Sequence, residues 1–248
     1  MRKNIVIVVI ALIVFIAIMS NVLDNGLNGK TIAFFGDSLM EGYGNDFKAL
    51  DYYLAKSLPN SKFINNSKSG STITDNTGND NMIMMNQVKT LTGEPDIIVF
   101  DGGANDIIGY GLGFLNNELK KEIGTVEQDP NKMSDTNTVI GDLEEIIVEL
   151  QKKYPKAKLC YLQIFLIDDA TIDKITIDES KKPEMKSRRD QLYSQIKILC
   201  EKRGVEYLNV TDKFVETEKK YRQDDWIHLK EEGYQVLTHY LLEKLEQL

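Results

Sequence analysis

The stretch Thr31–Gly44 constrains the fold of this chain more than any other. It reads TIAFFGDSLMEGYG: an apolar run from Ile32 to Phe35, a glycine, the polar pair Asp37-Ser38, and two further glycines. This pattern predicts a buried strand that ends in a tight turn, with a serine at the carboxyl end of the strand. In an open α/β sheet, ligands bind at that end of the strands. Ser38 is therefore either a nucleophile at a binding site or only the N-cap of the next helix.

Apolar runs and amphipathic helical patterns alternate through the rest of the chain. Further strands are predicted at Lys62–Asn65, Asp96–Asp101, Lys158–Leu166 and Val205–Val210, and helices at Phe47–Leu58, Met84–Leu91, Val139–Tyr154, Leu192–Cys200 and from Glu231 onward. Two polar segments, Gly109–Asn137 and Asp168–Lys186, are interpreted as long surface excursions that form the rim of a binding site. The alternation predicts a single α/β domain with three layers, α/β/α, around a five-stranded parallel sheet.

Charge and composition exclude several kinds of function. The 248 residues carry a net charge of −8, from 30 basic and 38 acidic side chains, so nucleic acid is not an expected partner. Cys160 and Cys200 fit no metal motif and are predicted to be buried thiols, with a disulfide between them as the alternative. The chain has only two histidines, and its glycines match no nucleotide-binding loop, so neither a metal nor a cofactor is expected.

The N-terminus differs in character from the rest of the chain. Arg2 and Lys3 precede an uncharged, mostly apolar run over residues 5–23. As a helix this run would be about 28 Å long, close to the thickness of a hydrocarbon core of roughly 30 Å. The positive charges before it place the short end inside the cell and the rest of the chain outside the cytoplasm. The pattern predicts a single-pass anchor in the cell membrane.

A cleaved signal peptide, which would give a secreted protein, is the alternative for the same segment. Ala17-Ile18-Met19 matches a cleavage site poorly, which favours the anchor. In either case residues 1–23 are the anchor or signal, residues 24–29 a linker, and residues 30–248 one folded domain.

Polar clusters follow the predicted strands, where a site on this architecture would lie. Ser38 offers a hydroxyl, and a nucleophilic serine needs a base within reach and an acceptor that fixes the base's tautomer. His239 lies off the inward face of the last helix and is expected to be exposed. His228 lies just before that helix, three residues after Asp225, so the two side chains can meet within one turn.

Four sequence blocks carry a resemblance to a known family. They are Gly36-Asp37-Ser38-Leu39, Gly70 within SKSGSTITD, Gly103-Ala104-Asn105-Asp106, and Asp225-Trp226-Ile227-His228. In this order, and over about Lys30 to the C-terminus, the chain resembles the SGNH hydrolases, the GDSL esterase/lipase superfamily. The resemblance implies a flavodoxin-like fold and an enzyme that acts on ester bonds without a cofactor.

The resemblance also implies a role for each matching residue. Ser38 would attack an acyl carbonyl while His228 takes its proton and Asp225 orients His228. The backbone N–H groups of Ser38 and Gly70 and the side-chain amide of Asn105 would form the oxyanion hole. Asp37 and Asp106 are expected to be structural. Trp226 stands where the family commonly has a small residue, which is expected to narrow the cleft.

Three functions stay open from the residues alone. The first is a serine esterase that hydrolyses small acyl esters of carbohydrates, of the cell envelope or of lipids. The second uses the same residues as an acyltransferase to a glycan acceptor. The third is a catalytically silent surface module that only binds its ligand. The pattern does not specify an oligomeric state.

Overall fold

The computed structural model describes residues 26–75, 79–112, 120–164, 168–210 and 218–248. Five parallel strands form one sheet in the order β2-β1-β3-β4-β5. Their bounds are Thr31–Phe35 (β1), Lys62–Asn65 (β2), Ile97–Phe100 (β3), Lys158–Gln163 (β4) and Glu206–Asn209 (β5). The sheet confirms the predicted α/β class and the five parallel strands. The strand order changes direction at β1, between β2 and β3, so a crevice at the carboxyl ends of β1 and β3 is expected.

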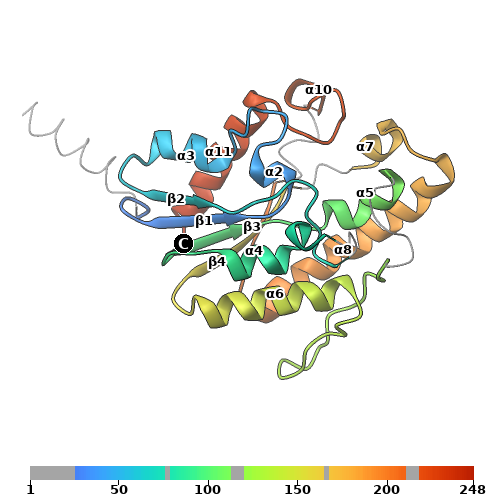
Figure 1. The fold of residues 1–248 in the computed structure, drawn as a ribbon, viewed down its shortest axis with the longest axis horizontal. Coiled ribbons are helices and arrows are strands. Elements are labelled where there is room, and N and C mark those ends of the chain that lie inside the picture. Colours follow the sequence, from blue (N-terminus) through green and yellow to red (C-terminus); the bar gives the residue numbers. More distant parts are fainter. Residues whose placement is uncertain (1–25, 76–78, 113–119, 165–167, 211–217) are drawn as a thin grey trace, which may run out of the picture.

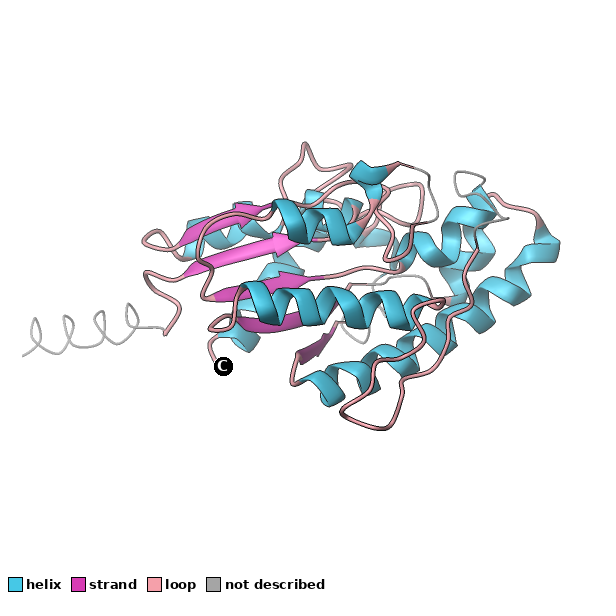
Figure 2. Ribbon diagram, turned by 60° about the horizontal axis from the view of Figure 1, so that its bottom comes forward, coloured by secondary structure: helices cyan, strands magenta, loops and turns pink. Residues whose placement is uncertain are grey.

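Helices cover both faces of the sheet (Figure 1). The helices are α2 (Ser38–Glu41), α3 (Leu50–Ser57), α4 (Met84–Thr90), α5 (Ala104–Leu112), α6 (Val139–Lys153), α7 (Asp169–Lys174), α8 (Lys182–Arg203), α10 (Glu218–Tyr221) and α11 (Glu231–Leu245), with short 3-10 turns η1 (Asp80–Met82) and η3 (Glu179–Lys181). Helices α3 and α11 pack on one face, and α4, α6 and α8 pack on the other (Figure 1). The turned view in Figure 2 shows helices on both sides of the strands. The three-layer prediction is confirmed.

The strands are apolar throughout because both faces are covered. Successive side chains of a strand point to opposite faces. Accordingly Ile32 and Phe34 belong to the core under α3 and α11, while Ala33 and Phe35 belong to the core under α4, α6 and α8. All four are fully buried. The two cores fix β1 from both sides, so the turn that follows it starts from a rigid strand.

The two cysteines lie in different cores. Cys160 packs in the core under α3 and α11, and Cys200 packs in the core under α8, so the sheet separates them. Both are free thiols, and the disulfide alternative is wrong. Burial raises the pKa of each thiol to about 12, so both stay protonated and unreactive at neutral pH.

Several predicted boundaries differ from the structure. Phe47 lies outside α3, with a positive φ of 56° and 66% of its surface exposed. The excursion predicted at Asp168–Lys186 contains α7, η3 and the start of α8, so it is largely helical. In the segment Gly109–Asn137, α5 continues to Leu112, and Ile123 is buried in the core, so the described part is not a plain surface loop.

The predicted N-terminal anchor and the first two residues of the predicted linker lie outside the described residues. Within the part of the chain that the structure describes, no helix has the length and apolar character needed to span a membrane. The anchor, the signal peptide and the domain bounds at 23 and 30 therefore stay predictions.

Candidate active site

The turn after β1 presents Ser38 at the carboxyl edge of the sheet. Asp37 is the N-cap of α2, since its Oδ1 accepts a hydrogen bond from the Leu39 N–H at 2.9 Å. Ser38 is thus not needed as a cap, and its hydroxyl faces the site. Gly36 has a φ of 151°, and a Cβ there would lie 1.7 Å from Oδ1 of Asp101. Only glycine lets the backbone come this close to the Asp101 side chain, which explains why a glycine begins the turn.

Asp225, His228 and Ser38 form one hydrogen-bonded line. His228 Nε2 lies 2.9 Å from Ser38 Oγ, and His228 Nδ1 lies 2.6 Å from Asp225 Oδ2. An ionised carboxylate can only accept, so Nδ1 carries the ring proton and Nε2 is left to accept the serine proton. The structure therefore brings together three side chains that are up to 190 residues apart in the sequence.

The loop that carries the histidine is held from both sides. Arg222 and Leu229 form an antiparallel bridge at its base, and the Gln223 side-chain amide donates to the Gly44 carbonyl oxygen at 2.8 Å. Trp226, at its tip, has a φ of 64°, an uncommon conformation for a bulky side chain. Its ring lies 5.3 Å from the Lys174 amine of α7.

The charge on Asp225 is fixed by its hydrogen bonds. Partial burial alone would raise the pKa of this carboxyl. The hydrogen bond from the His228 ring and the backbone N–H donors of His228 and Ile227 outweigh burial and hold the pKa at about 2. Asp225 is therefore ionised throughout the neutral range, as an orienting carboxylate must be.

The three residues predicted to form the oxyanion hole line one cavity. Within the described residues, the backbone N–H groups of Ser38 and Gly70 donate to no other protein group. Gly70 has a φ of 78°, a left-handed conformation that glycine adopts without strain. The Asn105 amide donates one hydrogen to the Ser71 carbonyl oxygen at 2.8 Å and keeps the other. All three donor residues line the same cavity.

That cavity has a volume of about 220 Å³ and is mostly apolar. Its lining residues are Ser38, Tyr43, Ser69, Gly70, Asn105, Ile108, Ile227 and His228. Ile227 lines the cavity, whereas Trp226, which was expected to narrow the cleft, does not. Ile108 lines the cavity, and no described residue of the two excursions does. The second excursion contacts the loop that carries His228 instead, through Lys174 beside Trp226 and Asp168 beside Arg222.

Sequence reasoning missed several residues around the site. The ring of Tyr43 lies 4.7 Å from the ring of His228. The Glu41 carboxylate accepts hydrogen bonds from the backbone and hydroxyl of Ser69, which brace the loop of Gly70. Tyr43 and Glu41 lie outside the four sequence blocks, although a carboxylate one turn after the predicted nucleophile was a signal that could have been used.

Three carboxyls lie beneath the nucleophile. Burial raises the pKa of Asp37 to about 6 and that of Asp101 well above its usual range. Burial also raises the pKa of Asp106, whose oxygens accept hydrogen bonds from the Ile73 N–H at 2.9 Å and from the Thr74 hydroxyl at 2.8 Å. Asp37 and Asp106 bind neighbouring backbone, as predicted for structural residues.

The two histidines are separated as expected. The His239 side chain is 76% exposed and pairs with Glu243, on a helix surface. In the described parts of the chain, no three His, Cys, Asp or Glu side chains are grouped so as to hold a metal ion.

A family comparison agrees with this geometry. A model of the GDSL-like lipase/acylhydrolase family matches residues 34–236. The chain therefore belongs to this family of ester-hydrolysing enzymes. No curated protein matches the chain in sequence.

Solved structures of low sequence identity share the fold. A Lactobacillus plantarum protein has 19% identity and a TM-score of 0.66, covering 89% of this chain and 98% of that one. A lipase/acylhydrolase from Enterococcus faecalis has 17% identity and a TM-score of 0.58, covering 88% and 96%. A mutant of Axe2, an acetyl-xylooligosaccharide esterase from Geobacillus, has 16% identity and a TM-score of 0.58, covering 88% and 94%.

Proposed function

We propose that this chain is a serine acylhydrolase in which Ser38 is the nucleophile, His228 the general base and Asp225 its orienting carboxylate. The observation that carries the proposal is the continuous line of hydrogen bonds from Asp225 through the imidazole to the serine hydroxyl. A serine hydroxyl is a weak nucleophile at neutral pH and needs such a base.

The acylation step follows from these positions. Ser38 Oγ attacks the ester carbonyl carbon while His228 Nε2 takes the hydroxyl proton. The carbonyl oxygen becomes negative and is stabilised by the N–H groups of Ser38 and Gly70 and by the free hydrogen of the Asn105 amide. The imidazolium then donates its proton to the leaving alcohol, and an acyl-enzyme remains.

The second half repeats the first with water. His228 removes a proton from a water molecule, which attacks the acyl carbon, and the same donors stabilise the second oxyanion. The imidazolium returns the proton to Ser38 and the free acid leaves. Asp225 stays ionised throughout, because its pKa of about 2 lies far below neutral pH. It stabilises the imidazolium in both halves.

The cavity supports a short acyl group as the substrate. Its volume of about 220 Å³ lies below the roughly 300–1,000 Å³ of pockets that hold drug-sized ligands. Ile108 and Ile227 offer apolar contact to a few carbons, and a long fatty acyl chain would extend out of the cavity. A carbohydrate or cell-envelope O-acyl ester is the proposed class, and the fold likeness to Axe2 is in keeping with it.

We place this activity outside the cytoplasm on the sequence pattern of residues 1–23. An apolar run after two basic residues supports a membrane anchor, with export after cleavage as the alternative.

The test is ester hydrolysis by the full-length chain in detergent. The kcat/KM for p-nitrophenyl acetate and for p-nitrophenyl butyrate is expected to be at least about ten times the kcat/KM for p-nitrophenyl palmitate. Ser38→Ala is expected to lower kcat by roughly 10³-fold or more while leaving the circular dichroism spectrum unchanged. His239→Gln, which changes the exposed histidine, is the matched control and is expected to keep full activity.

An active Ser38→Ala variant would overturn the proposal. A wild-type chain that binds esters without releasing acid would favour the silent module. Formation of an acylated sugar instead of free acid, when sugar acceptors are added, would favour the acyltransferase.

A further inference from the structure

Gln87 is a buried polar side chain on an otherwise apolar helix face. It lies in α4 between Met84 and Val88, and only 3% of its surface is exposed. Burying an amide costs free energy unless every hydrogen bond is replaced. Here the amide is fully used, so its partners indicate what the residue does.

Two of those hydrogen bonds join the start of the nucleophile turn. The Gly36 N–H donates to Gln87 Oε1 at 2.9 Å, and Gln87 Nε2 donates to the Gly36 carbonyl oxygen at 2.9 Å. The side chain thus pairs with Gly36 as a neighbouring strand would, at the residue where β1 has ended. Ser38, two residues later, supplies both the nucleophile and one oxyanion donor.

The third hydrogen bond reaches the glycine loop. Gln87 Nε2 donates to Ser71 Oγ at 2.6 Å, and Ser71 directly follows Gly70. The carbonyl oxygen of the same serine accepts the hydrogen bond from Asn105 at 2.8 Å. The Gln87 amide therefore contacts the turn that leads to Ser38 and the loop of Gly70, which carry two of the proposed donors. Its partner Ser71 also accepts the hydrogen bond that orients Asn105, the third donor.

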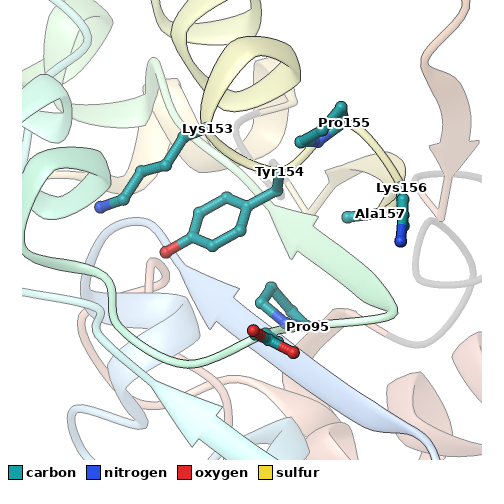
Figure 3. A pocket seen from close by; sticks show the side chains of 7 residues that line it. Pro95, Lys153, Tyr154, Pro155, Lys156 and Ala157 are labelled. Atoms are coloured by element: carbon teal, nitrogen blue, oxygen red, sulfur yellow. The ribbon is translucent and has the colours of Figure 1, made fainter.

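Helix α4 is itself held in place. Lys153 Nζ donates to the carbonyl oxygens of Val88, Lys89 and Leu91 at 2.7–2.9 Å, and the Tyr154 hydroxyl donates to that of Leu91 at 2.6 Å. These two side chains line a cavity of about 270 Å³ beside the amino ends of β3 and β4. Figure 3 shows them there. Lys153 and Tyr154 thus fix the end of the helix that positions Gln87.

We propose that Gln87 is a positioning residue that sets the relative geometry of the three oxyanion donors. The inference rests on the proposed function, since it assumes that Ser38, Gly70 and Asn105 stabilise the oxyanion. Gln87 touches no substrate. It acts by holding the ends of two loops at a fixed separation, and donors held rigidly need no reorganisation as charge develops.

The variants remove the amide with little change in shape. Gln87→Met keeps the length of the side chain and loses all three hydrogen bonds. Gln87→Glu keeps the shape, but its carboxylate cannot donate to the Gly36 carbonyl. Ser71→Ala removes only the link to the glycine loop, and it serves if the others fold poorly. Val88→Ala, at the neighbouring buried position of the same helix, is the control for a general loss of stability.

The measurements separate positioning from stability. Complete loss of one oxyanion donor lowers kcat roughly 10²–10³-fold, so partial misplacement is expected to lower kcat about 10–100-fold in Gln87→Met and Gln87→Glu. KM is expected to change by less than about threefold, because the donors act in the transition state. Affinity for a boronic acid, which mimics the tetrahedral intermediate, is expected to fall in step with kcat/KM. Ser71→Ala is expected to show the same pattern at smaller size.

The same series distinguishes the two ways of failing. Val88→Ala is expected to lower Tm and keep kcat within about twofold. If Ser38→Ala is inactive while folded Gln87 and Ser71 variants keep wild-type kcat and boronic acid affinity, the inference is overturned and the proposed function stands. If Ser38→Ala is active, the proposed function itself fails.

Discussion

Asp225 at the rim of the site and Asp37 beneath the nucleophile lie close to the same serine, but in different surroundings. The Asp225 side chain is 45% exposed and accepts hydrogen bonds from the His228 ring and two backbone N–H groups. Asp37 is 1% exposed, and its carboxyl accepts one backbone hydrogen bond, from Leu39. The pKa is held at about 2 at the rim, and burial raises it to about 6 beneath the nucleophile.

The difference shows that the balance between burial and hydrogen-bond donors, rather than nearness to the reacting atoms, decides which carboxyl carries charge. Asp225 is ionised and faces the imidazole that must become positive. Asp37 and Asp101 lie side by side in sequence-distant turns, joined by the hydrogen bond from the Asp37 N–H to Asp101 Oδ1 at 3.1 Å. Burial raises the pKa of both carboxyls, and the charge of Asp37 adds to the rise at Asp101. We infer that the rim serves catalysis and that the buried pair serves structure.

Asp225→Asn gives the sharpest test of the comparison. The amide keeps the size of the side chain, but it removes the charge and favours the wrong imidazole tautomer. A fall in kcat of roughly 10³–10⁴-fold is expected, measured with p-nitrophenyl acetate at pH 7.5. Asp37→Asn, which keeps an N-cap oxygen, is the matched variant and is expected to retain kcat within about fivefold. Equal losses in the two variants would show that the comparison is mistaken.

Asp37 should instead appear in the pH dependence of stability. Its pKa is about 6 in the folded chain and roughly 3.9 in an unfolded one, so the folded state holds its proton more tightly. The contribution of Asp37 to stability is present below about pH 4 and is lost as pH rises through 6. Asp225 has the opposite sign, and its contribution is lost only as pH falls from about 4 towards 2.

The expected result is a smaller pH effect in Asp37→Asn. The wild-type chain is expected to lose free energy of unfolding between pH 4 and pH 7, and the variant to lose about 2–3 kcal/mol less. Urea titrations at pH 4, 5.5 and 7 measure the difference. Asp101, whose pKa is also raised by burial, leaves part of the slope in both proteins. Identical slopes would mean that Asp37 is ionised in the folded state.

The sheet and the meeting of the site residues could be predicted because they depend on local patterns. Apolar runs mark strands buried on both faces, and the carboxyl ends of parallel strands share one edge. Ser38, Gly70 and Asn105 follow three such strands, so their proximity follows from the topology. Asp225 and His228 are three residues apart and meet within one turn.

The remainder depends on contacts that no local pattern encodes. The start of α8 was interpreted as part of the polar excursion that ends at Lys186, yet Lys182 is buried and its amine donates to the Asp173 carbonyl oxygen at 3.0 Å. Gln87 can be recognised in the sequence as a polar residue among the apolar residues of its helix. Its partner Gly36 cannot be predicted from the local pattern, because it is 51 residues away. Trp226 was expected in the cleft, but it does not line the cavity, and its ring lies beside the Lys174 amine. These features follow from packing rather than from periodicity.

Tyr234→Phe is expected to have the smallest effect and tests the structural side of the comparison alone. Tyr234 of α11 is fully buried, and its hydroxyl donates to the Leu39 carbonyl oxygen at 2.9 Å, just after the nucleophile. Removing the hydroxyl leaves that oxygen without its donor and is expected to cost about 1 kcal/mol, which lowers Tm by roughly 2–4 °C.

The Leu39 carbonyl takes no part in the proposed oxyanion hole, so kcat is expected to stay within about threefold. Tyr240→Phe is the matched control on the same helix, since its hydroxyl donates to the Asn209 carbonyl oxygen at 3.0 Å where water can replace it. It is expected to shift Tm by less than Tyr234→Phe. A Tyr234→Phe variant that kept its Tm but lost most of its kcat would place the buried groups beneath Ser38 in catalysis, and the distinction between rim and buried pair would no longer hold.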